Sequence, residues 1–527
     1  GPSVKRQSGF LQPRLNESNV LGTSVQTPYF HVISDNKDYT VSPTLFNDND
    51  ILMIQNEYRQ ENKNSSFITD IGYTKGYKSV VTENKKKDIA HLFAKFSLNL
   101  DLESFLDSEL EFNVEHVTND TYLKVFETNL INTNQKIFPK NKSQLSSSIN
   151  VHLEKENYIF DTGMAAFETL SGADSDRYQY VLPYYNYTNN LISNNLFNFD
   201  FNSSGSNNYL NTNNLKSEII NNFNFNSIDF FSNYGFKNNF GVFFKNINTV
   251  AKNDAKYKSS PQIELMNLVN LETSLPLKKS DDNYSNTFTP KISLRANPTN
   301  MKNHSNSDRQ ITSDNMFSIN RLGISDSFES GQSLTLGLDY KKQSIKGINK
   351  YFDLNLGTIL RDTKEDNIPT RSTIGSRQSN LFGSTTFNYS NRMSIDYDFA
   401  IDNNMKTFDH NSIGTTFNFD YFVTKFKYVE TNNKMGDTNF IENSSKINFN
   451  DNNYLTFKTR RNRTISLTEY YDLVYEYQND CLIAGIKYKK TYYQDRDLKP
   501  AEDMIFTISL FPITQYEHKI DQSLYKK

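Results

Sequence analysis

The chain has 527 residues, a formal net charge of -3, 36% hydrophobic residues and a mean hydropathy of -0.68. These values exclude a helical membrane protein, because no stretch approaches the ~18 consecutive apolar residues that a membrane-spanning helix needs. They give no indication of nucleic-acid binding by bulk charge. The single cysteine excludes an internal disulfide framework and a zinc cluster built on cysteines.

Aromatic residues decide between the classes that remain. A polar, partly disordered chain would have few of them, whereas this chain has 40 Phe and 32 Tyr. In a β-barrel wall only alternate positions face lipid, and aromatic side chains mark the two membrane interfaces. A low mean hydropathy and a high aromatic content are therefore expected together. Tyr and Phe would form these aromatic belts, because the chain has no Trp.

Five strands are predicted near the N-terminus, at 9–15, 24–34, 38–46, 51–60 and 65–74. If the first strand runs outward, the direction alternates and residues 75–89 form an outer loop. Three consecutive lysines lie in this loop: Lys85, Lys86 and Lys87. They are either simply solvated or in contact with phosphate groups outside the cell.

Alternation with a period of two is clearest in the segment 91–102. One row of side chains suits lipid: Leu92, Ala94, Phe96, Leu98, Leu100 and Leu102. The other row suits water: Phe93, Lys95, Ser97, Asn99 and Asp101. Residues 109–115 repeat this pattern.

The region 184–260 is rich in Asn, which is typical of low-complexity disorder. Aromatic and amide residues nevertheless alternate within it, as in residues 221–225. We therefore expect strands here rather than an unordered tract.

Alternation returns at 334–340, 394–402, 417–421 and 473–478, and clusters of Asn, Asp, Gly and Ser separate the strands. The last strand is predicted at 503–511. Its lipid-facing row would be Met504, Phe506, Ile508 and Leu510, with Thr507 and Ser509 on the luminal row.

These patterns predict an all-β chain, a large closed antiparallel transmembrane β-barrel of roughly 26 strands. A soluble β-sandwich also shows alternation, but two packed sheets cannot use so many strands, whereas one closed sheet can. A stacked β adhesin would need a short internal repeat, and the sequence has none.

Several short motifs follow one another along the chain. They are Arg6 to Pro13 (RQSGFLQP), Leu21 to Thr23, Thr27 to Phe30, Asp38 to Pro43, Glu57 to Arg59, Asn320 to Gly323 with Asp326, Glu329 and Gly331, then Pro369, Ser372 and Ser379, and finally Tyr477 to Cys481 with Asp495 to Asp497. In order and spacing this series resembles the barrel portion of the LptD family. The segment 130–260 matches the family pattern poorly.

The resemblance implies an integral protein of the Gram-negative outer membrane that inserts lipopolysaccharide (LPS) into the outer leaflet. The lipid would leave through a lateral gate between the first and last strands. Further implied partners are an LptE-like lipoprotein that plugs the lumen and a periplasmic LPS-transport bridge. The bridge would reach the barrel through a β-jellyroll domain that is absent from this chain. LPS phosphates would be the outer contact of the three lysines.

Neither catalysis nor a cofactor is expected, since LPS transport makes and breaks no bond in the lipid. The seven His residues show no metal-ligand spacing. Pairs of Asp and Glu are better explained as strand faces than as catalytic dyads.

Proline cannot donate a ladder hydrogen bond, so it is a direct way to weaken one seam of a barrel. Pro13 and Pro28 match the gate prolines of the family. The predicted gate residues are Pro13, Pro28, Phe10, Leu11, Phe506 and Ile508. From the residues alone, the alternative that these prolines only mark strand ends or bulges stays open. Pro43 is assigned to an ordinary strand end.

Charged side chains on strands must face the water-filled side of a barrel. This makes Asp38, Arg59 and Arg321 candidates for the lumen, either to keep it wet or to contact a substrate. The competing function is an outer-membrane porin or solute transporter channel, which shares the same wall pattern. A plugged transporter would carry its own N-terminal plug. Alternation here begins near residue 10, so any plug is expected from another chain.

Cys481 is expected at the edge of a periplasmic turn, because the strand before it runs inward if 503–511 is the last inward strand. In the family the corresponding cysteine pairs with one in the jellyroll domain. The resemblance therefore implies a free thiol at the periplasmic rim of this chain. By residue type alone, a small buried hydrophobe remains the alternative.

The chain opens with Gly1 rather than Met, which indicates a processed or engineered start. We expect residues 1–8 to be a lead-in or an engineered remnant. Residues 9–512 would form the barrel, and residues 513–527 a C-terminal tail.

Overall fold

A computed structural model of the chain describes residues 6–18, 20–47, 51–76, 89–126, 129–130, 137–171, 177–211, 213–479, 482–492 and 502–510. The regular elements of this part are strands, one short α-helix and two single-turn 3-10 helices, η2 (Thr370–Ser372) and η3 (Asn433–Met435). Within these residues, no helix has the length and apolar character needed to cross a membrane.

The elements of the N-terminal part are β1 (Gly9–Phe10), β2 (Arg14–Ser18), β3 (Gly22–Gln26), β4 (Tyr29–Ser34), β5 (Lys37–Phe46), β6 (Leu52–Glu61), β7 (Ser65–Thr74), β8 (Ile89–Asn99), β9 (Asp107–Val117) and α1 (Tyr122–Phe126). Those of the middle part are β10 (Gln144–Glu154), β11 (Tyr158–Thr169), β12 (Tyr178–Ser193), β13 (Phe197–Leu210), β14 (Asn214–Ser227), β15 (Phe230–Phe231), β16 (Lys237–Lys252), β17 (Gln262–Ser274), β18 (Leu277–Ser280) and β19 (Tyr284–Asn297). Those of the C-terminal part are β20 (Gly331–Ser344), β21 (Tyr351–Arg361), β22 (Leu381–Ser390), β23 (Met393–Ile401), β24 (Phe408–Phe419), β25 (Phe422–Thr431), β26 (Thr438–Asn450), β27 (Asn453–Asn462), β28 (Leu467–Gln478), β29 (Leu482–Thr491) and β30 (Glu502–Leu510).

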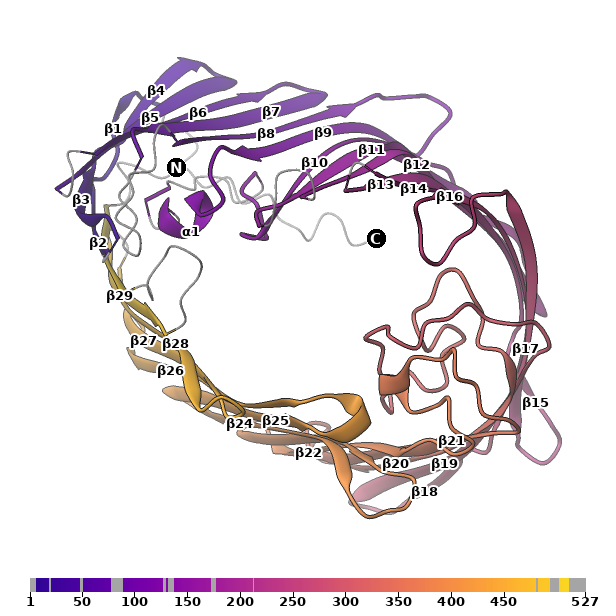
Figure 1. Ribbon diagram of the computed structural model, residues 1–527. Coiled ribbons are helices and arrows are strands. Elements are labelled where there is room, and N and C mark those ends of the chain that lie inside the picture. Colours follow the sequence, from indigo (N-terminus) through magenta and orange to yellow (C-terminus); the bar gives the residue numbers. More distant parts are fainter. Residues whose placement is uncertain are drawn as a thin grey trace.

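The strands form one antiparallel sheet that closes on itself (Figure 1). Strands that follow one another in the chain are neighbours in the sheet, and β2 pairs with β30 to complete the ring. Four strands are interrupted by short breaks, as β1/β2, β3/β4, β14/β15 and β17/β18, so that the wall has 26 strands. The predicted closed barrel of roughly 26 strands is confirmed.

Successive side chains of a strand face opposite sides of the wall. In β5, Leu45 is 62% exposed, whereas Asp38 and Phe46 on the other row are buried. The ring of Phe46 lies 6.1 Å from the ring of Phe126 in α1, which lies inside the barrel. The buried row is therefore luminal, and the exposed apolar row faces lipid, as in other transmembrane barrels.

The two ends of the barrel differ in their connections. At the end where β1 begins, short turns such as 35–36 and 391–392 join the strands. At the other end the connections include 118–143, 298–330 and 362–380. In outer-membrane barrels the short turns are periplasmic and the long loops extracellular. The first strand therefore runs outward, in agreement with the direction expected from the sequence.

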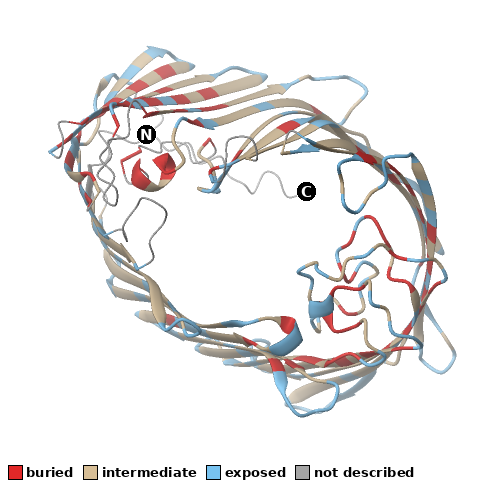
Figure 2. Cartoon of the chain, viewed as in Figure 1, coloured by how far each residue is buried: buried red, intermediate tan, exposed pale blue. Residues whose placement is uncertain are grey.

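Parts of these long connections lie inside the ring (Figure 1). α1 rests on the luminal face of the N-terminal strands, and the connections 298–330 and 362–380 pack against β21–β23 through a second apolar cluster. Figure 2 shows buried residues in both places. The chain thus supplies luminal material of its own, which the sequence pattern did not indicate.

Phe93 illustrates the consequence for one strand. The alternation in β8 correctly gives opposite faces to Leu92 and Phe93, since Leu92 is 37% exposed and Phe93 is fully buried. A water-facing environment for Phe93 is wrong, however. Its ring lies 5.4 Å from the ring of Phe138, which belongs to the luminal segment 118–143. The predicted strand also extends too far, because β8 ends at Asn99.

Residues 184–260 form strands, as the alternation predicted. β12 and β16 have 16 residues each, and β13 and β14 have 14 each. Near the middle of these strands, their outward face carries a polar ladder. Ser203 Oγ donates to Asn221 Oδ1 at 2.7 Å, and Asn221 Nδ2 donates to Asn246 Oδ1 at 3.0 Å. Asn221 and Asn246 therefore belong to a hydrogen-bonded row that joins β13, β14 and β16.

Candidate functional site

The seam of the barrel is the contact between the first strand (β1 and β2) and the last strand (β30). β2 pairs with β30 over four residues, from Leu15 opposite Phe506 to Ser18 opposite Asp503. The neighbouring pair β29–β30 extends over nine residues. Within the described residues β1 pairs with β4 alone. The described part of the seam is therefore paired in its outer half, whereas residues 11–14 and 507–510 on its periplasmic side form no ladder with each other.

Pro13 lies in the break between β1 and β2. Phe10 is opposite Tyr29, but Arg14 is opposite Gln26, so the register shifts by one residue between these pairs. Such a shift is a β-bulge, which bends a strand and interrupts its ladder. Because Pro13 has no N–H, it cannot donate to either neighbouring strand. The proline is located where the paired half of the seam changes into the unpaired half.

Two further prolines reduce pairing next to the seam. Pro28 lies in the break between β3 and β4, and its carbonyl oxygen accepts a hydrogen bond from the Leu11 N–H at 2.8 Å. Because Pro28 has no N–H, it cannot donate a second hydrogen bond back to Leu11. Pro43 accepts one from the Thr27 N–H at 3.1 Å in the same way. The predicted strand end at Pro43 is wrong, because Pro43 lies within β5, opposite Ile54 of β6. β5 tolerates it because the missing donor faces the interrupted second strand and not β6.

The other predicted gate residues lie along the same seam. Phe10 is 75% exposed on the outward face, and its ring lies 5.1 Å from the ring of Tyr29. Since the Leu11 N–H points toward the second strand, the backbone groups of Phe10 point the opposite way, toward the unpaired half. Phe506 is 39% exposed on the lipid side. The backbone of Ile508 belongs to β30, and its side chain lies outside the described part of the chain.

Asp38 and Arg59 are directly opposite each other on the luminal side of β5 and β6. Arg59 Nε lies 2.7 Å from Asp38 Oδ1 and 3.5 Å from a carboxylate oxygen of Glu57, and Arg6 pairs with the second oxygen of Asp38. The Asp38 side chain is buried, so the two guanidinium groups compensate a charge that would be costly by itself. This arrangement holds the residues before β1 against the wall.

The described residues of the segment 118–143, here called the luminal brace, connect the seam to the rest of the wall. Asn129 Nδ2 donates to Ser24 Oγ at 2.8 Å, and Gln26 Nε2 donates to the carbonyl oxygen of Asn129 at 2.7 Å. Asn16 Nδ2 lies 3.4 Å from Asn129 Oδ1. Because Asn16 belongs to β2 and the other two residues belong to β3, one residue of the brace contacts both strands on this side of the seam.

A buried hydrogen-bond chain anchors the luminal brace. His91 Nε2 lies 3.1 Å from Asp70 Oδ1, and His91 Nδ1 lies 2.6 Å from the hydroxyl of Tyr122 in α1. Gln55 Nε2 donates to the second oxygen of Asp70 at 2.6 Å. Burial, together with the charge of Asp70, raises the pKa of the Tyr122 hydroxyl well above its ordinary value. The hydroxyl therefore stays protonated and available as a donor.

The luminal brace is a part of the fold that the alternation of side chains does not predict. The feature of the sequence that could have indicated it is Tyr122–Phe126, where large apolar side chains follow a predicted strand but do not alternate with polar ones. A loop that folds back into a lumen needs apolar residues but has no fixed period, so a pattern search does not separate it from a strand end.

Arg321 lies in the connection 298–330 and not on a strand. Its guanidinium makes a two-point ion pair with Glu329, with Nε–Oε2 at 2.8 Å and Nη2–Oε1 at 2.6 Å. Arg361 of β21 pairs with the same carboxylate, and Arg295 of β19 donates to two backbone carbonyls of the connection. Burial alone would raise the pKa of Glu329, but the charges of Arg321 and Arg295 outweigh it and lower this pKa to about 2. The network fixes the connection inside the ring.

A second charged group attaches a neighbouring loop. Asp326 accepts hydrogen bonds from His304 Nε2 at 2.7 Å, from Lys256 Nζ at 2.9 Å and from the hydroxyl of Tyr257. Burial opposes ionisation of Asp326, but these donors outweigh it and lower its pKa well below its ordinary value. The loop 253–261 is thereby tied to the connection 298–330, and these charges serve as internal links.

Two predicted sites fall outside the part of the chain that the structure describes. They are the outer-loop lysines Lys85, Lys86 and Lys87, and Cys481. Their expected roles stay predictions.

The chain is similar to known proteins in its sequence. A family model described as LptD, LPS transport system D, matches residues 95–453. LPS-assembly protein LptD of Idiomarina loihiensis is 27% identical over 124 residues, which are 24% of this chain and 15% of that protein. LPS-assembly protein LptD of Legionella pneumophila (strain Paris) is 28% identical over 173 residues, which are 31% of this chain and 20% of that protein. The matches thus span a fifth or less of these relatives.

Solved structures of large outer-membrane receptors resemble the chain at low identity. The siderophore receptor PirA of Pseudomonas aeruginosa aligns over 96% of this chain and 82% of its own, at 8% identity and a TM-score of 0.34. The alcaligin receptor FauA of Bordetella pertussis aligns over 96% of this chain and 76% of its own, at 7% identity and a TM-score of 0.32.

Proposed function

The chain belongs to the LptD family, and from this premise we propose that its barrel inserts lipopolysaccharide into the outer leaflet through a lateral opening between β1/β2 and β30. The barrel is an integral outer-membrane protein. The observation that carries the proposal is the seam, where four paired residues stand against nine in the adjacent strand pair.

An amphipathic lipid needs two environments at once, water for its saccharide and hydrocarbon for its acyl chains. A closed barrel separates these environments along its whole height, so the lipid can change compartment only where two strands part. Each ladder hydrogen bond adds about 1 kcal/mol to a strand pair. A seam with few such bonds is therefore the place where parting costs least. Transport of this kind changes no covalent bond, so no catalytic group is needed.

The partners follow from the same premise. We propose that an LptE-like lipoprotein occupies part of the lumen that the chain's own connections leave open. LPS would arrive from a periplasmic bridge through a jellyroll domain, and the described residues of the seam are unpaired on this periplasmic side. Lipid could thus enter the seam from below before the outer half opens. Cys481 would be the attachment point for the jellyroll, and the lysines 85–87 a contact for LPS phosphates on the outer surface.

The test restores a donor at the seam. Replacing Pro13 by Val supplies one backbone N–H, which can add about 1 kcal/mol and lower the open fraction by a factor of about five. We expect cells that carry only this variant to show less LPS at the surface. Pro298→Ala, in an exposed position of the connection 298–330, is the matched control. Undiminished delivery by a correctly assembled Pro13→Val variant would contradict the lateral route.

The second candidate, a porin or solute channel, rests on the closed barrel alone. It predicts steady conductance of the purified protein in planar bilayers and no accompanying lipoprotein. Purification of the chain from outer membranes separates the two, since the proposed function requires that a separately encoded lipoprotein stays bound.

A further inference from the structure

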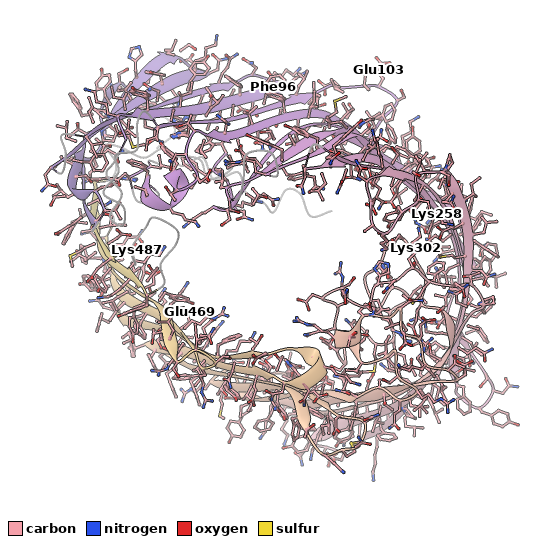
Figure 3. The ribbon with its side chains drawn as sticks, in the orientation of Figure 1. Phe96, Glu103, Lys258, Lys302, Glu469 and Lys487 are labelled. Atoms are coloured by element: carbon pink, nitrogen blue, oxygen red, sulfur yellow. The ribbon has the colours of Figure 1, made fainter. Side chains whose placement is uncertain are left out.

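One part of the luminal surface next to the seam carries a dense set of basic side chains. We define the basic wall by seven residues on β25–β29: Lys425, Lys427, Lys446, Lys458, Arg460, Lys487 and Lys489. Figure 3 labels Lys487 on this part of the barrel, together with Glu469 of the neighbouring strand. Lys487 and Lys489 are on β29, which pairs with β30, so the wall ends one strand from the seam.

The strand register shows that these side chains share one face. Directly opposed residues lie on the same side of a sheet. One row runs from Lys425 through Ser444, Lys458, Asp472, Lys489 and Asp503 to Ser18 of β2. A second row connects Lys446, Thr456, Val474, Lys487, Ile505 and Asn16. Asn16 contacts Asn129 of the luminal brace, so both rows face the lumen.

The outward neighbours confirm this assignment. Phe426, Leu473 and Ile486 alternate with the basic residues on β25, β28 and β29, and they are 48%, 37% and 42% exposed. Such large apolar side chains belong to the lipid face of a transmembrane barrel. The basic residues therefore lie on the opposite, water-facing side.

The wall has more positive than negative charge. Within its rows the acidic residues are Glu442, Asp472 and Asp503, against seven basic ones. Arg460 Nε lies 3.0 Å from Glu469, and Lys487 Nζ lies 3.9 Å from Asp472. The four lysines of the wall that are farthest from the seam, Lys425, Lys427, Lys446 and Lys458, are exposed and form no ion pair in the part of the chain that the structure describes. Lys446 Nζ lies over the ring of Tyr454, 4.4 Å from its centroid, which leaves its charge without an acidic partner as well. The four charges are available to an anionic ligand.

We infer that the basic wall binds the anionic groups of a saccharide chain, phosphate or carboxylate, as the chain moves along the lumen toward the seam. A lysine ammonium is a point charge with three rotatable donors, so it accepts an anionic group in many orientations. Small polar side chains such as Ser444 and Thr456 separate the lysines and can bond to sugar hydroxyls. Neighbouring strands are about 4.8 Å apart, so a flexible polyanion can contact several lysines at once.

The exposed setting determines how strong this binding is. Each ion pair at a water-filled surface contributes no more than about 1 kcal/mol and is screened by salt. Several weak contacts hold a chain on the wall without trapping it, which suits a substrate that must move on. A saccharide fits better than a folded acidic protein, because the lysines are spread along rows that cross β25–β29. A flexible chain can follow such a row, whereas a folded protein would contact only part of it. The identification of the saccharide with that of LPS rests on the proposed function.

The experiment measures binding on the purified protein with any lipoprotein that accompanies it. The probe is the water-soluble phosphorylated core oligosaccharide released from LPS by mild acid, with its enzymatically dephosphorylated form as a second probe. The test variant combines Lys425→Gln, Lys427→Gln, Lys446→Gln and Lys458→Gln. The matched control removes the same charge elsewhere, with Lys278→Gln, Lys279→Gln, Lys346→Gln and Lys406→Gln, at four exposed lysines.

We expect the test variant to bind the phosphorylated probe at least about tenfold more weakly than the wild type and the control, and we expect this difference to vanish at high salt. In planar bilayers its ion selectivity should shift toward cations. Equal binding by the test and control variants would overturn the inference. Loss of the accompanying lipoprotein from the test variant alone would also overturn it, since the wall would then be a protein-docking surface. Because the assay needs no LPS delivery, it stays informative if the proposed function fails.

Discussion

The two flanks of the seam have the same strand architecture but opposite luminal surfaces. On the N-terminal flank the luminal brace covers β5–β8, and its side chains Tyr122 and Phe126 are fully buried. On the C-terminal flank no described segment packs on the luminal face of β25–β29 in the way the brace packs on β5–β8, and this face carries the exposed lysines of the basic wall. One flank is thus built like a protein core and the other like a protein surface.

This difference indicates which edge of the seam moves. Asn129 of the brace contacts β2 and β3 and holds that edge to the buried cluster. β30 is held by β29 over nine residues and by β2 over four. When the seam parts, we expect β2 and β3 to keep their position and β29 and β30 to be displaced. Three changes test this asymmetry, in order of expected effect.

The first change removes a core side chain of the braced flank. Phe126→Ala leaves a cavity where the phenyl ring contacts Phe46 and Tyr122, and such substitutions cost about 3–5 kcal/mol. The free energy of unfolding in urea, measured in detergent micelles, should fall by this amount. The control is Phe426→Ala on the open flank, where the side chain is 48% exposed. Equal losses for the two variants would show that the flanks do not differ in packing.

The second change removes one buried hydroxyl. Tyr122→Phe keeps the ring but leaves His91 Nδ1 without its partner at 2.6 Å, which should cost about 1–3 kcal/mol of unfolding free energy. Tyr488→Phe is the comparison, since its hydroxyl contacts Glu502 at 2.8 Å on the exposed surface of the other flank. We expect the same urea measurement to show almost no effect for Tyr488→Phe. A larger loss of unfolding free energy for Tyr488→Phe than for Tyr122→Phe would contradict the tighter packing of the braced flank.

The third change loosens the contact between brace and seam. Asn129→Ala removes side-chain hydrogen bonds to Ser24 and Asn16, a loss of about 1 kcal/mol that corresponds to a factor of about five in opening. Amide hydrogen exchange of residues 15–18, followed by mass spectrometry, should become faster by this factor. Asn443→Ala on the open flank serves as control and should leave this exchange unchanged. Unaltered exchange in Asn129→Ala would mean that the brace does not hold the seam.

Much of the wall could be predicted from sequence, because lipid on one side and water on the other impose a period of two on each strand. The last strand illustrates this, since 503–511 was expected and β30 spans Glu502–Leu510. The closed topology follows in turn from the number of strands. The faces of Asp38 and Arg59 follow from the same alternation. Their direct opposition does not, since it depends on the register between two strands and not on either strand alone.

The luminal connections could not be predicted in this way. The sequence predicts Arg321 to lie on a strand with its side chain in the lumen, yet it lies in a connection whose position depends on a buried ion pair with Glu329. The brace is determined by complementarity between its apolar side chains and a luminal surface that exists only once the barrel has closed. The bulge at Pro13 is similar, because proline removes a donor at a known position but the shift of register appears only with the paired strand.

The long strands β12–β14 and β16 lie opposite the seam in the ring (Figure 1). On their outward face, apolar side chains such as Phe223 and Phe244 lie next to the polar ladder of Ser203, Asn221 and Asn246. A tilted strand of this length rises by about 40 Å, whereas the hydrocarbon layer it crosses is about 25 Å thick. These strands are therefore longer than the membrane requires, and part of each has to lie among lipid head groups or in water. There the sheet is held together by its own hydrogen bonds, without the support of lipid.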